Sequence, residues 1–516
     1  GAPSRRTRTS SGQALRRLFA SLRGRDVAEL SVLFCTEGTY PFVQGGVGTW
    51  CDIICRELSQ VEFTLYAITG SPEVSYQFDP PPNARRVVHV PLFGTIDPTE
   101  YLLRDLPFDE VRRRRWLTDD DAVQGRFLPL LERLLDGLDV TGPEIRDYGV
   151  LVHELHQWFE DHDWRRTWTS RFVYDAFARR AAASPDNPSV GDVNTALHWL
   201  SSFLLPLAVP VPECDLVHTT IAGFAALPGV IAKHRDGTPF LVTEHGVWVR
   251  ERYIAVSAAK FSLYAKRFLM ALSSFVARLV YAHADLIAPV VEFNRRWEIP
   301  YGADPLRIRA IYNGVDPGVF VPKPKPAETA GGPVAVAAAR IFPLKDIETM
   351  IRSAAVARDL LPEIRYLVYG SLDADVPYVE KCHALVAELG LEQTFQLRGF
   401  HSKPAELYTE GDICVLSSIS EAFPYTVLEA MACQRPVVGT DVGGVREALD
   451  GFGIVVPPRD PEAFGQAVVR LLADDEFRRE LGRRCREEVL AKYRTSNSVN
   501  AYRDAYEELT RRRIAA

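Results

Sequence analysis

The chain contains 516 residues, of which 47% are hydrophobic and 25% are charged. This length exceeds what one compact core holds and predicts two to four globular domains, while the composition excludes a disordered or fibrous chain. The net charge of -7 argues against a dedicated nucleic-acid-binding protein.

The eight cysteines are scattered and show neither a CxxC pair nor the spacing of zinc ligands. Most lie in apolar runs, which indicates reduced, buried thiols and favours a cytoplasmic protein. The longest apolar stretch, 197–212, is shorter than the roughly 20 residues of a membrane-spanning helix, and prolines interrupt it.

Residues 1–28 form a basic N-terminal arm. Within it, Leu15, Leu18, Phe19 and Leu22 recur at helical spacing among arginines. This amphipathic pattern fits a helix that lies on an anionic membrane or on a partner protein. It also fits, more commonly, a surface helix packed on its own domain.

Residues 29–320 are predicted to form an α/β domain. Buried apolar strands, beginning with 30–38, alternate with helices such as 50–58, and this alternation predicts a parallel sheet. Residues 100–205 are rich in charged residues and tryptophan and are expected to form a helical insertion. The alternation returns in the segments CDLVHTT, FLVTEHG and ADLIAPV.

The segment 321–333, rich in proline, lysine and glycine, is the expected linker to a second α/β domain at 334–492. Two doubly wound domains predict a cleft between the carboxyl ends of their strands, where such sheets bind ligands. The last segment, 493–516, is predicted to be a helix that packs back toward the first domain through an apolar stripe. The stripe consists of Val499, Tyr502, Tyr506 and Leu509.

The stretch SEAFPYTVLEAMA, at 420–432, carries two glutamates at a predicted strand-to-helix turn. The amides at the start of this helix suit a phosphate group, because they have no acceptor within the helix. Glu421, at the turn, is placed to accept hydrogen bonds from sugar hydroxyls, and Glu429 from two vicinal hydroxyls such as those of a ribose. The alternative is that Glu421 caps the helix and Glu429 is a solvated helix residue.

Two cations follow another predicted strand of the second domain. Arg340 stands directly after the apolar run VAVAAA, and Lys345 comes five residues later. An arginine can grip two oxygens of a diphosphate while a lysine adds a point charge, although two unrelated surface cations would look the same. In the first domain, Gly45 and Gly46 lie in a strand-to-helix loop and would let the backbone approach a ligand closely, or form a plain turn.

Taken together, these motifs and the YNGVD segment before the linker resemble retaining glycosyltransferase family 4 of the GT-B fold, over about residues 30–500. The segments 35–58 and 243–252 are most similar to the cytoplasmic glycosyltransferases of Pel exopolysaccharide synthesis. The resemblance implies two Rossmann-like domains facing across a cleft, and transfer of a sugar from a UDP-sugar to a growing exopolysaccharide with retention of configuration.

The resemblance also implies roles for individual residues. It places Arg340, Lys345, Glu421 and His245 in catalysis, with the two cations neutralising the departing diphosphate and the histidine near the reacting sugar carbon. Glu429 would hold the ribose, and the region from Arg398 to Phe400 would bracket the base. The expected substrate-binding residues are Gly45, Gly46, Arg398, Phe400, Phe423, Pro424, Tyr425, Thr426 and Glu429.

The resemblance implies neither a metal nor another cofactor, because cations and dipoles stabilise the leaving group. The DxD-like sequences at 161–163 and 373–375 are therefore interpreted as solvated loops. The arginine run 112–115 is interpreted as a solvated helix face, and the tryptophans of the insertion as helix packing.

UDP-glucose and UDP-N-acetylgalactosamine are both plausible donors, and the acceptor would be a saccharide. Inner-membrane polysaccharide synthesis and export proteins are the expected partners, which would place the chain in the cytoplasm or peripherally at that membrane. The alternatives are a non-catalytic nucleotide-sugar-binding scaffold of a secretion complex, a GT-B phosphorylase and an epimerase. Intact Arg340, Lys345, Glu421 and Glu429 argue against the scaffold.

Overall fold

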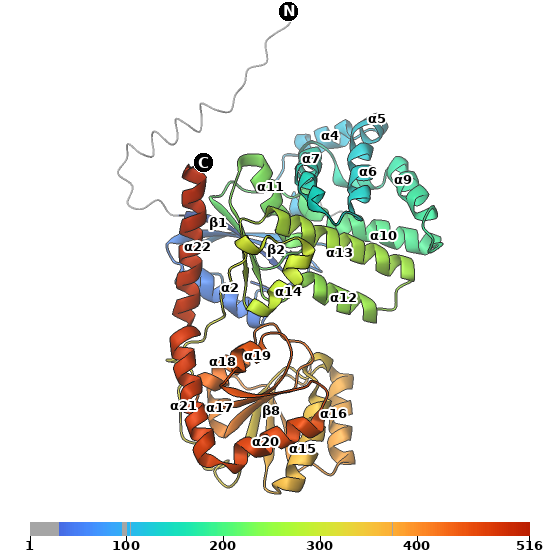
Figure 1. The fold of residues 1–516 in the computed structure, drawn as a ribbon. Helices are drawn as coiled ribbons and strands as arrows, with labels where there is room; N and C mark the ends of the chain where they lie inside the picture. Colours follow the sequence, from blue (N-terminus) through green and yellow to red (C-terminus); the bar gives the residue numbers. More distant parts are fainter. Residues whose placement is uncertain (1–29, 95–100, 104, 374, 516) are drawn as a thin grey trace, which may run out of the picture.

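The computed structural model describes residues 30–94, 101–103, 105–373 and 375–515 (Figure 1). The predicted basic arm and its amphipathic segment lie outside these residues. The described chain forms two α/β units, one above the other in Figure 1, each built around its own sheet.

The first sheet has six parallel strands in the order β3-β2-β1-β4-β5-β6. Its central strands are apolar along almost their whole length, because helices cover both faces of the sheet. The strands are β1 (Leu30–Glu37), β2 (Val61–Thr69), β3 (Ala84–Pro91), β4 (Leu216–Thr219), β5 (Phe240–Glu244) and β6 (Leu286–Pro289).

Helices pack on the two faces of this sheet in separate apolar cores. One core joins the sheet to α2, and the other joins it to α11, α13 and the helical region between β3 and β4. The helices are α2 (Gly46–Glu57), α11 (Leu227–Asp236), α12 (Trp248–Ala258), α13 (Leu263–His283) and α14 (Arg295–Glu298), with short 3-10 turns η4 (Phe224–Ala226), η5 (Glu292–Asn294), η6 (Ile299–Tyr301) and η7 (Pro305–Arg307).

The described residues between β3 and β4 are mostly helical. Trp158, Trp164 and Trp168 are buried around Phe127, whereas Trp116 is 77% exposed. The elements are α4 (Phe108–Leu117), α5 (Asp120–Ala122), the π-helix η1 (Val123–Phe127), α6 (Leu128–Gly137), η2 (Pro143–Asp147), α7 (Tyr148–Asp161), α8 (Trp164–Trp168), α9 (Arg171–Ala182), α10 (Val190–Phe203) and η3 (Leu205–Ala208).

The interpretation of 161–163 as a solvated loop is wrong for Asp163. This side chain is buried, accepts a hydrogen bond from the amide of Arg166 at 2.8 Å and forms an ion pair with Arg115. Asp163 therefore caps the start of α8.

The second sheet also has six parallel strands, in the order β12-β11-β10-β7-β8-β9. Numbered within each domain, both sheets have the order 3-2-1-4-5-6 of a dinucleotide-binding Rossmann fold. The strands are β7 (Val334–Ala338), β8 (Arg365–Tyr369), β9 (Phe395–Gly399), β10 (Ile413–Leu416), β11 (Val437–Thr440) and β12 (Gly453–Val456).

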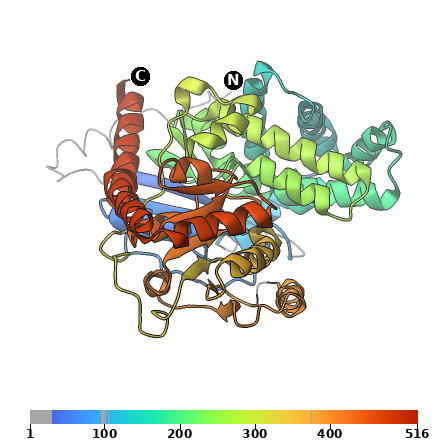
Figure 2. The ribbon, with the colours of Figure 1, turned by 60° about the horizontal axis from the view of Figure 1, so that its bottom comes forward.

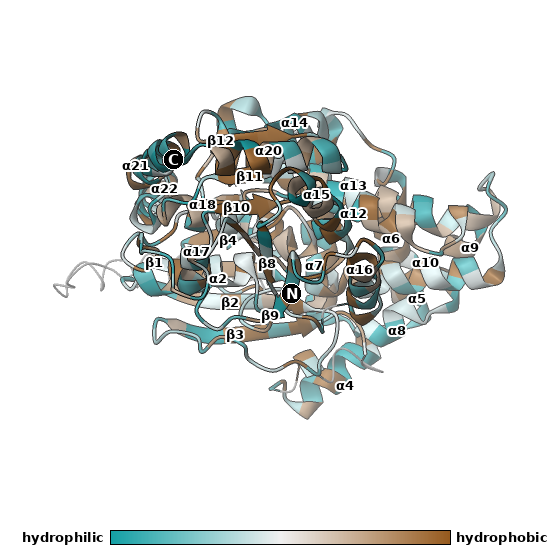
Figure 3. Ribbon diagram, turned by 90° about the horizontal axis from the view of Figure 1, so that it is seen from below, coloured by the Kyte–Doolittle hydropathy of each residue, from teal (hydrophilic) through white to brown (hydrophobic). Residues whose placement is uncertain are grey.

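Helices enclose this second sheet, and its apolar strands appear brown in Figure 3 beneath a more polar exterior. The elements are the 3-10 turn η8 (Pro343–Lys345), α15 (Ile347–Leu360), α16 (Val376–Glu388), α17 (Pro404–Glu410), α18 (Tyr425–Ala432), α19 (Val445–Leu449), α20 (Pro461–Ala473) and α21 (Asp475–Lys492).

The last helix, α22 (Thr495–Ala515), leaves the second domain and runs beside the first (Figure 1, Figure 2). Its apolar stripe packs in the same core as β1 and α2. The hydroxyl of Tyr506 shares a 2.7 Å hydrogen bond with His218, and the hydroxyl of Thr243 donates to Tyr502 at 3.0 Å. This buried polar network fixes the register of α22 on the first sheet.

We predict that Tyr506→Phe destabilises the first domain, because it leaves the buried ring of His218 without this partner. The expected loss is about 1–3 kcal/mol in the free energy of urea unfolding. Tyr174→Phe, at an exposed tyrosine of α9, is the matched control and should change little. Equal effects of the two substitutions would contradict the prediction.

Candidate functional site

The carboxyl ends of the two sheets face each other, and the loops that follow the strands make contact there. Arg250 in α12 donates a 3.0 Å hydrogen bond to Ser420, which lies just beyond β10. Asn313, between the domains, donates to the carbonyl of Phe423 at 3.2 Å. A side chain at Gly46 would touch the ring of Tyr425, 3.4 Å away. We call this region the interdomain site.

Lys345 and Glu421 form an ion pair at the interdomain site. The lysine ends η8, after β7, and the glutamate follows β10, so two adjacent strands of the second sheet supply the pair. The hydroxyl of Ser418 donates to the same carboxylate at 2.6 Å, and that of Ser417 donates to the carbonyl of Lys345 at 2.8 Å. Both charged side chains are largely buried, at 20% and 10% exposed.

Arg340 stands at the carboxyl end of β7, as its position after the apolar run predicts. Its side chain is exposed, and the guanidinium lies over the ring of Phe342, 5.1 Å from the centroid. Among the described residues, no hydrogen bond or ion pair joins Arg340 to Lys345 or Glu421. The structure therefore brings Lys345 and Glu421 together, and it leaves the side chain of Arg340 free to reach a ligand.

Helix α18 begins at Tyr425, with Pro424 in the capping position. The backbone of Pro424 is extended, and the amides of Tyr425 and Thr426, in the first turn, have no acceptor within the helix. Phe423 is buried against Tyr312, whereas the ring of Tyr425 packs against the cores of both domains. The start of α18 is thus anchored at the interdomain site.

The glycine pair of the DVGGVRE loop packs directly onto the backbone at Glu421 and Ala422. Gly443 has a φ of +54°, and a Cβ there would overlap the carbonyl oxygen of Glu421 at 1.7 Å. The amide of Gly444 donates to the carbonyl of Ala422 at 2.6 Å. Only glycine permits this approach, which holds the loop that carries Glu421 in place.

Glu429 lies one turn into α18 and is half-buried. The hydroxyl of Tyr408 donates to its carboxylate at 2.6 Å. Burial raises the pKa of Glu429 to about 7, and the hydrogen bond from Tyr408 opposes this rise only in part. The alternative interpretation of Glu429 as a solvated helix residue does not hold for this half-buried side chain.

His245 follows β5 directly and is buried at the interdomain side of the first sheet. Its ring meets Trp50 of α2 edge to face, with centroids 4.4 Å apart. Burial lowers the pKa of His245 to about 3, so the imidazole is neutral at pH 7. The atom Nε2 is buried and makes no hydrogen bond within the described residues, so a polar atom at this position lacks a partner.

Arg398 and Phe400 lie at the end of β9, an edge strand of the second sheet. Arg398 is exposed and donates to Gln396 at 3.1 Å, and Phe400 is 76% exposed. Among the described residues, no hydrogen bond or ion pair joins either side chain to Lys345 or Glu421.

The sequence reasoning missed two glutamates that organise the interdomain site. Glu37, at the end of β1, accepts hydrogen bonds from Trp248 and Arg252 of α12, both at 3.1 Å. Glu447 in α19 accepts a 2.6 Å hydrogen bond from the hydroxyl of Tyr312 and thereby ties the interdomain connection to the second domain. The segment TEG after a predicted strand was the only signal for Glu37.

Two glutamates of the first domain are fully buried, and one of them directly precedes His245 in the chain. Glu244 accepts hydrogen bonds from the hydroxyl of Tyr281 at 2.7 Å and from the amide of Ala222 at 2.8 Å. Glu298 in α14 is 0% exposed, and neither of its oxygens has a partner among the described residues. Burial raises the pKa of Glu244 to about 7 and that of Glu298 to about 9.

Within the described ranges, no three histidine, cysteine, aspartate or glutamate side chains gather as metal ligands would. None of the helices in this part of the chain combines the length and the apolar character needed to cross a membrane.

The paired Rossmann sheets define a GT-B fold, and comparison with solved structures shows the same arrangement. Sucrose-phosphate synthase from Thermosynechococcus elongatus aligns with a TM-score of 0.59 over 93% of this chain and 99% of that one, at 17% identity. HepE from Anabaena, solved in complex with UDP, aligns with a TM-score of 0.58 over 93% and 100%, at 15% identity.

Two family models match the chain. The model described as "Domain of unknown function (DUF3492)" covers residues 30–306, more than half of the chain, and the chain belongs to this family. The model "Glycosyl transferases group 1" covers residues 322–488, which include the Lys345–Glu421 pair and α18.

Curated relatives match over shorter stretches. The D-inositol 3-phosphate glycosyltransferase of Kineococcus radiotolerans is 30% identical over 224 residues, which are 38% of this chain and 51% of the relative. An exopolysaccharide phosphotransferase of Streptomyces coelicolor is 28% identical over 234 residues, which are 44% of this chain and 24% of that protein. The chain thus spans about half of the first relative and less of the second.

We predict that Glu298→Gln reduces the loss of stability at alkaline pH. The folded chain holds the Glu298 proton up to about pH 9, whereas the unfolded chain releases it above the ordinary pKa of 4.5. The wild-type free energy of unfolding should therefore fall as the pH rises through this window.

Urea unfolding at pH 5.5 and 8.5 measures this difference, which the substitution should reduce by about 4 kcal/mol. Glu462→Gln, at an exposed glutamate of α20, should leave it unchanged. An unaltered pH dependence in Glu298→Gln would show that Glu298 is ionised in the folded protein.

Proposed function

We propose that this chain is a retaining, metal-independent glycosyltransferase that transfers a sugar from a UDP-sugar to a saccharide acceptor. The observation that carries the proposal is the Lys345–Glu421 ion pair beside the start of α18. A cation and free amides at the carboxyl end of a Rossmann sheet suit a diphosphate, and a carboxylate beside them suits sugar hydroxyls.

The half-buried Glu429 lies further along α18 and adds a second carboxylate to the proposed donor site. The carboxylate of Glu429 can accept hydrogen bonds from both hydroxyls of a ribose. The hydrogen bond that Tyr408 donates to one of its oxygens holds the carboxylate in place. The group 1 match over this domain and the UDP present in the HepE structure support a nucleotide donor. The donor sugar is proposed to be glucose or N-acetylgalactosamine.

The first domain supplies the opposite wall. His245 offers a neutral, unpaired ring nitrogen, and Gly46 lies against Tyr425. In the proposed step, the bond from the anomeric carbon to the diphosphate oxygen breaks and its electrons pass to the diphosphate. The acceptor hydroxyl forms the new bond on the same face of the sugar, and its proton passes to the departing phosphate. Arg340 and Lys345 stabilise the charge that develops there.

The proposed acceptor is a growing exopolysaccharide, as for PelF, the transferase of Pel exopolysaccharide synthesis. The segments 35–58 and 243–252, which resemble PelF, contain Gly45, Gly46 and His245, so the resemblance falls on the acceptor-side wall of the site. The proposal includes inner-membrane synthesis and export proteins as partners, with the chain on the cytoplasmic side of that membrane.

Release of UDP from UDP-glucose and from UDP-N-acetylgalactosamine tests the activity. We predict that Lys345→Ala lowers kcat at least about 100-fold and that a double variant with Arg340→Ala nearly abolishes turnover, because charge stabilisation at the diphosphate is lost. Lys403→Ala, at an exposed lysine that also pairs with a glutamate, is the control and should retain wild-type activity. Transfer by the double variant at the wild-type rate would refute the proposal.

Glu429 gives a separate prediction about nucleotide binding. Because its pKa is about 7, the carboxyl group gains a proton below neutral pH and accepts ribose hydroxyls less well. The affinity for UDP should therefore fall as the pH drops through 7, more steeply than in Glu429→Gln, where only the phosphate of UDP titrates. Calorimetric titration at pH 6 and 8 measures this, with Glu462→Gln as control. Identical pH dependence in wild type and Glu429→Gln would rule out the ribose role.

A further inference from the structure

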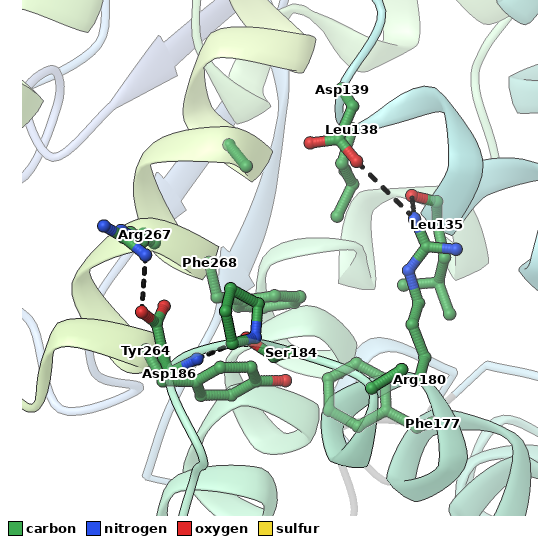
Figure 4. Close-up of a pocket in the computed structure, with 13 residues that line it drawn as sticks. Leu135, Leu138, Asp139, Phe177, Arg180, Ser184, Asp186, Tyr264, Arg267 and Phe268 are labelled. Carbon is green, nitrogen blue, oxygen red and sulfur yellow. Dashed lines mark hydrogen bonds and ion pairs between the residues drawn. The ribbon is translucent and has the colours of Figure 1, made fainter.

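A cavity of about 670 Å³ opens between α6, α9 and α13, and none of the residues that line it belongs to the interdomain site (Figure 4). Its walls come from these three helices and from the loop between α9 and α10. The proposed function makes no use of this cavity.

Aromatic rings form much of the cavity wall. Tyr264 and Phe268 lie one turn apart on the same face of α13, with stacked rings whose centroids are 6.4 Å apart. Phe177 of α9 is buried and meets Phe268 edge to face at 5.5 Å. Tyr264 and Phe268 are only half-buried, so they present apolar surface to whatever fills the cavity.

The hydroxyl of Tyr264 points toward Phe177 across the cavity (Figure 4). It makes no hydrogen bond to another described residue. A half-buried phenol usually finds a polar partner at its tip, so this hydroxyl is available to a ligand.

Charged groups at the rim occur in opposed pairs. Arg180 forms ion pairs with Asp136 and Asp139, and Arg267 forms one with Asp186. The residues that line the cavity include two arginines and two aspartates, so their charges balance. An anion such as a nucleotide would be repelled by the carboxylates. A purely apolar ligand would displace water from the ion pairs without offering hydrogen bonds in return, which is unfavourable.

We propose that this cavity binds a neutral carbohydrate chain. A sugar ring offers an apolar C–H face to Tyr264 and Phe268, and its uncharged hydroxyls can both donate to aspartate and accept from arginine. The volume lies in the range of small-ligand pockets and accommodates a short oligosaccharide. This site is separate from the proposed donor site and goes beyond the proposed function.

The test titrates the full chain with maltotetraose, cellotetraose and tetra-N-acetylchitotetraose, with binding followed by ligand-observed NMR in the presence of saturating UDP. At least one tetrasaccharide should bind with a millimolar dissociation constant. Tyr264→Ala should weaken it about tenfold, which is typical for loss of one aromatic contact. Tyr174→Ala, at a tyrosine of α9 that does not line the cavity, is the matched control and should bind as wild type does.

Tyr264→Phe keeps the ring and its packing and removes only the hydroxyl. It should weaken tetrasaccharide binding about two- to fivefold. If Tyr264→Ala melts at a lower temperature than wild type, Tyr264→Phe replaces it as the variant that tests the cavity. The inference is overturned if none of the three tetrasaccharides binds, if Tyr264→Ala and Tyr174→Ala bind alike, or if inorganic phosphate competes for the cavity. UDP affinity, measured on the same variants, reports separately on the proposed function and should not change.

Discussion

The ion pair between Lys345 and Glu421 is the interaction on which the proposed chemistry depends. A lysine whose ammonium group is held at a strand end has little freedom left to lose when a diphosphate arrives. Glu421 in turn is fixed by the hydroxyl of Ser418 and by the glycine loop that packs against its backbone. The loops that follow β7 and β10, the two central strands of the second sheet, therefore supply both charged side chains and fix their positions.

The first domain contacts the loops around Lys345 and Glu421 through residues that are far apart in the sequence. Arg250 binds Ser420, Gly46 lies against Tyr425, and Glu447 holds Tyr312 between the domains. Helix α22 adds a further tie, because it continues from the second domain and packs in the core of the first. Together these contacts hold the loops of the first domain against the start of α18.

The sequence predicted the fold well because each strand is a short apolar run bounded by loops, and structures of the GT-B class confirm the prediction. It also located the strand ends that carry Arg340, Lys345 and Glu421. It could not show which of these side chains meet, since Lys345 and Glu421 stand 76 positions apart and are brought together only by strand order. Glu37 and Glu447 were missed for the same reason, because their partners lie far along the chain. The burial of Asp163 depends on Thr118 and Arg115, which contact it from 45 and 48 positions earlier, and spacing alone does not reveal such contacts.

A crystal structure of the chain with UDP is the most direct test of the central claim. The account predicts that the diphosphate lies between the side chains of Arg340 and Lys345 and the first amides of α18, with the ribose hydroxyls against Glu429. A diphosphate bound elsewhere, with the Lys345–Glu421 pair unchanged and out of its reach, would contradict it.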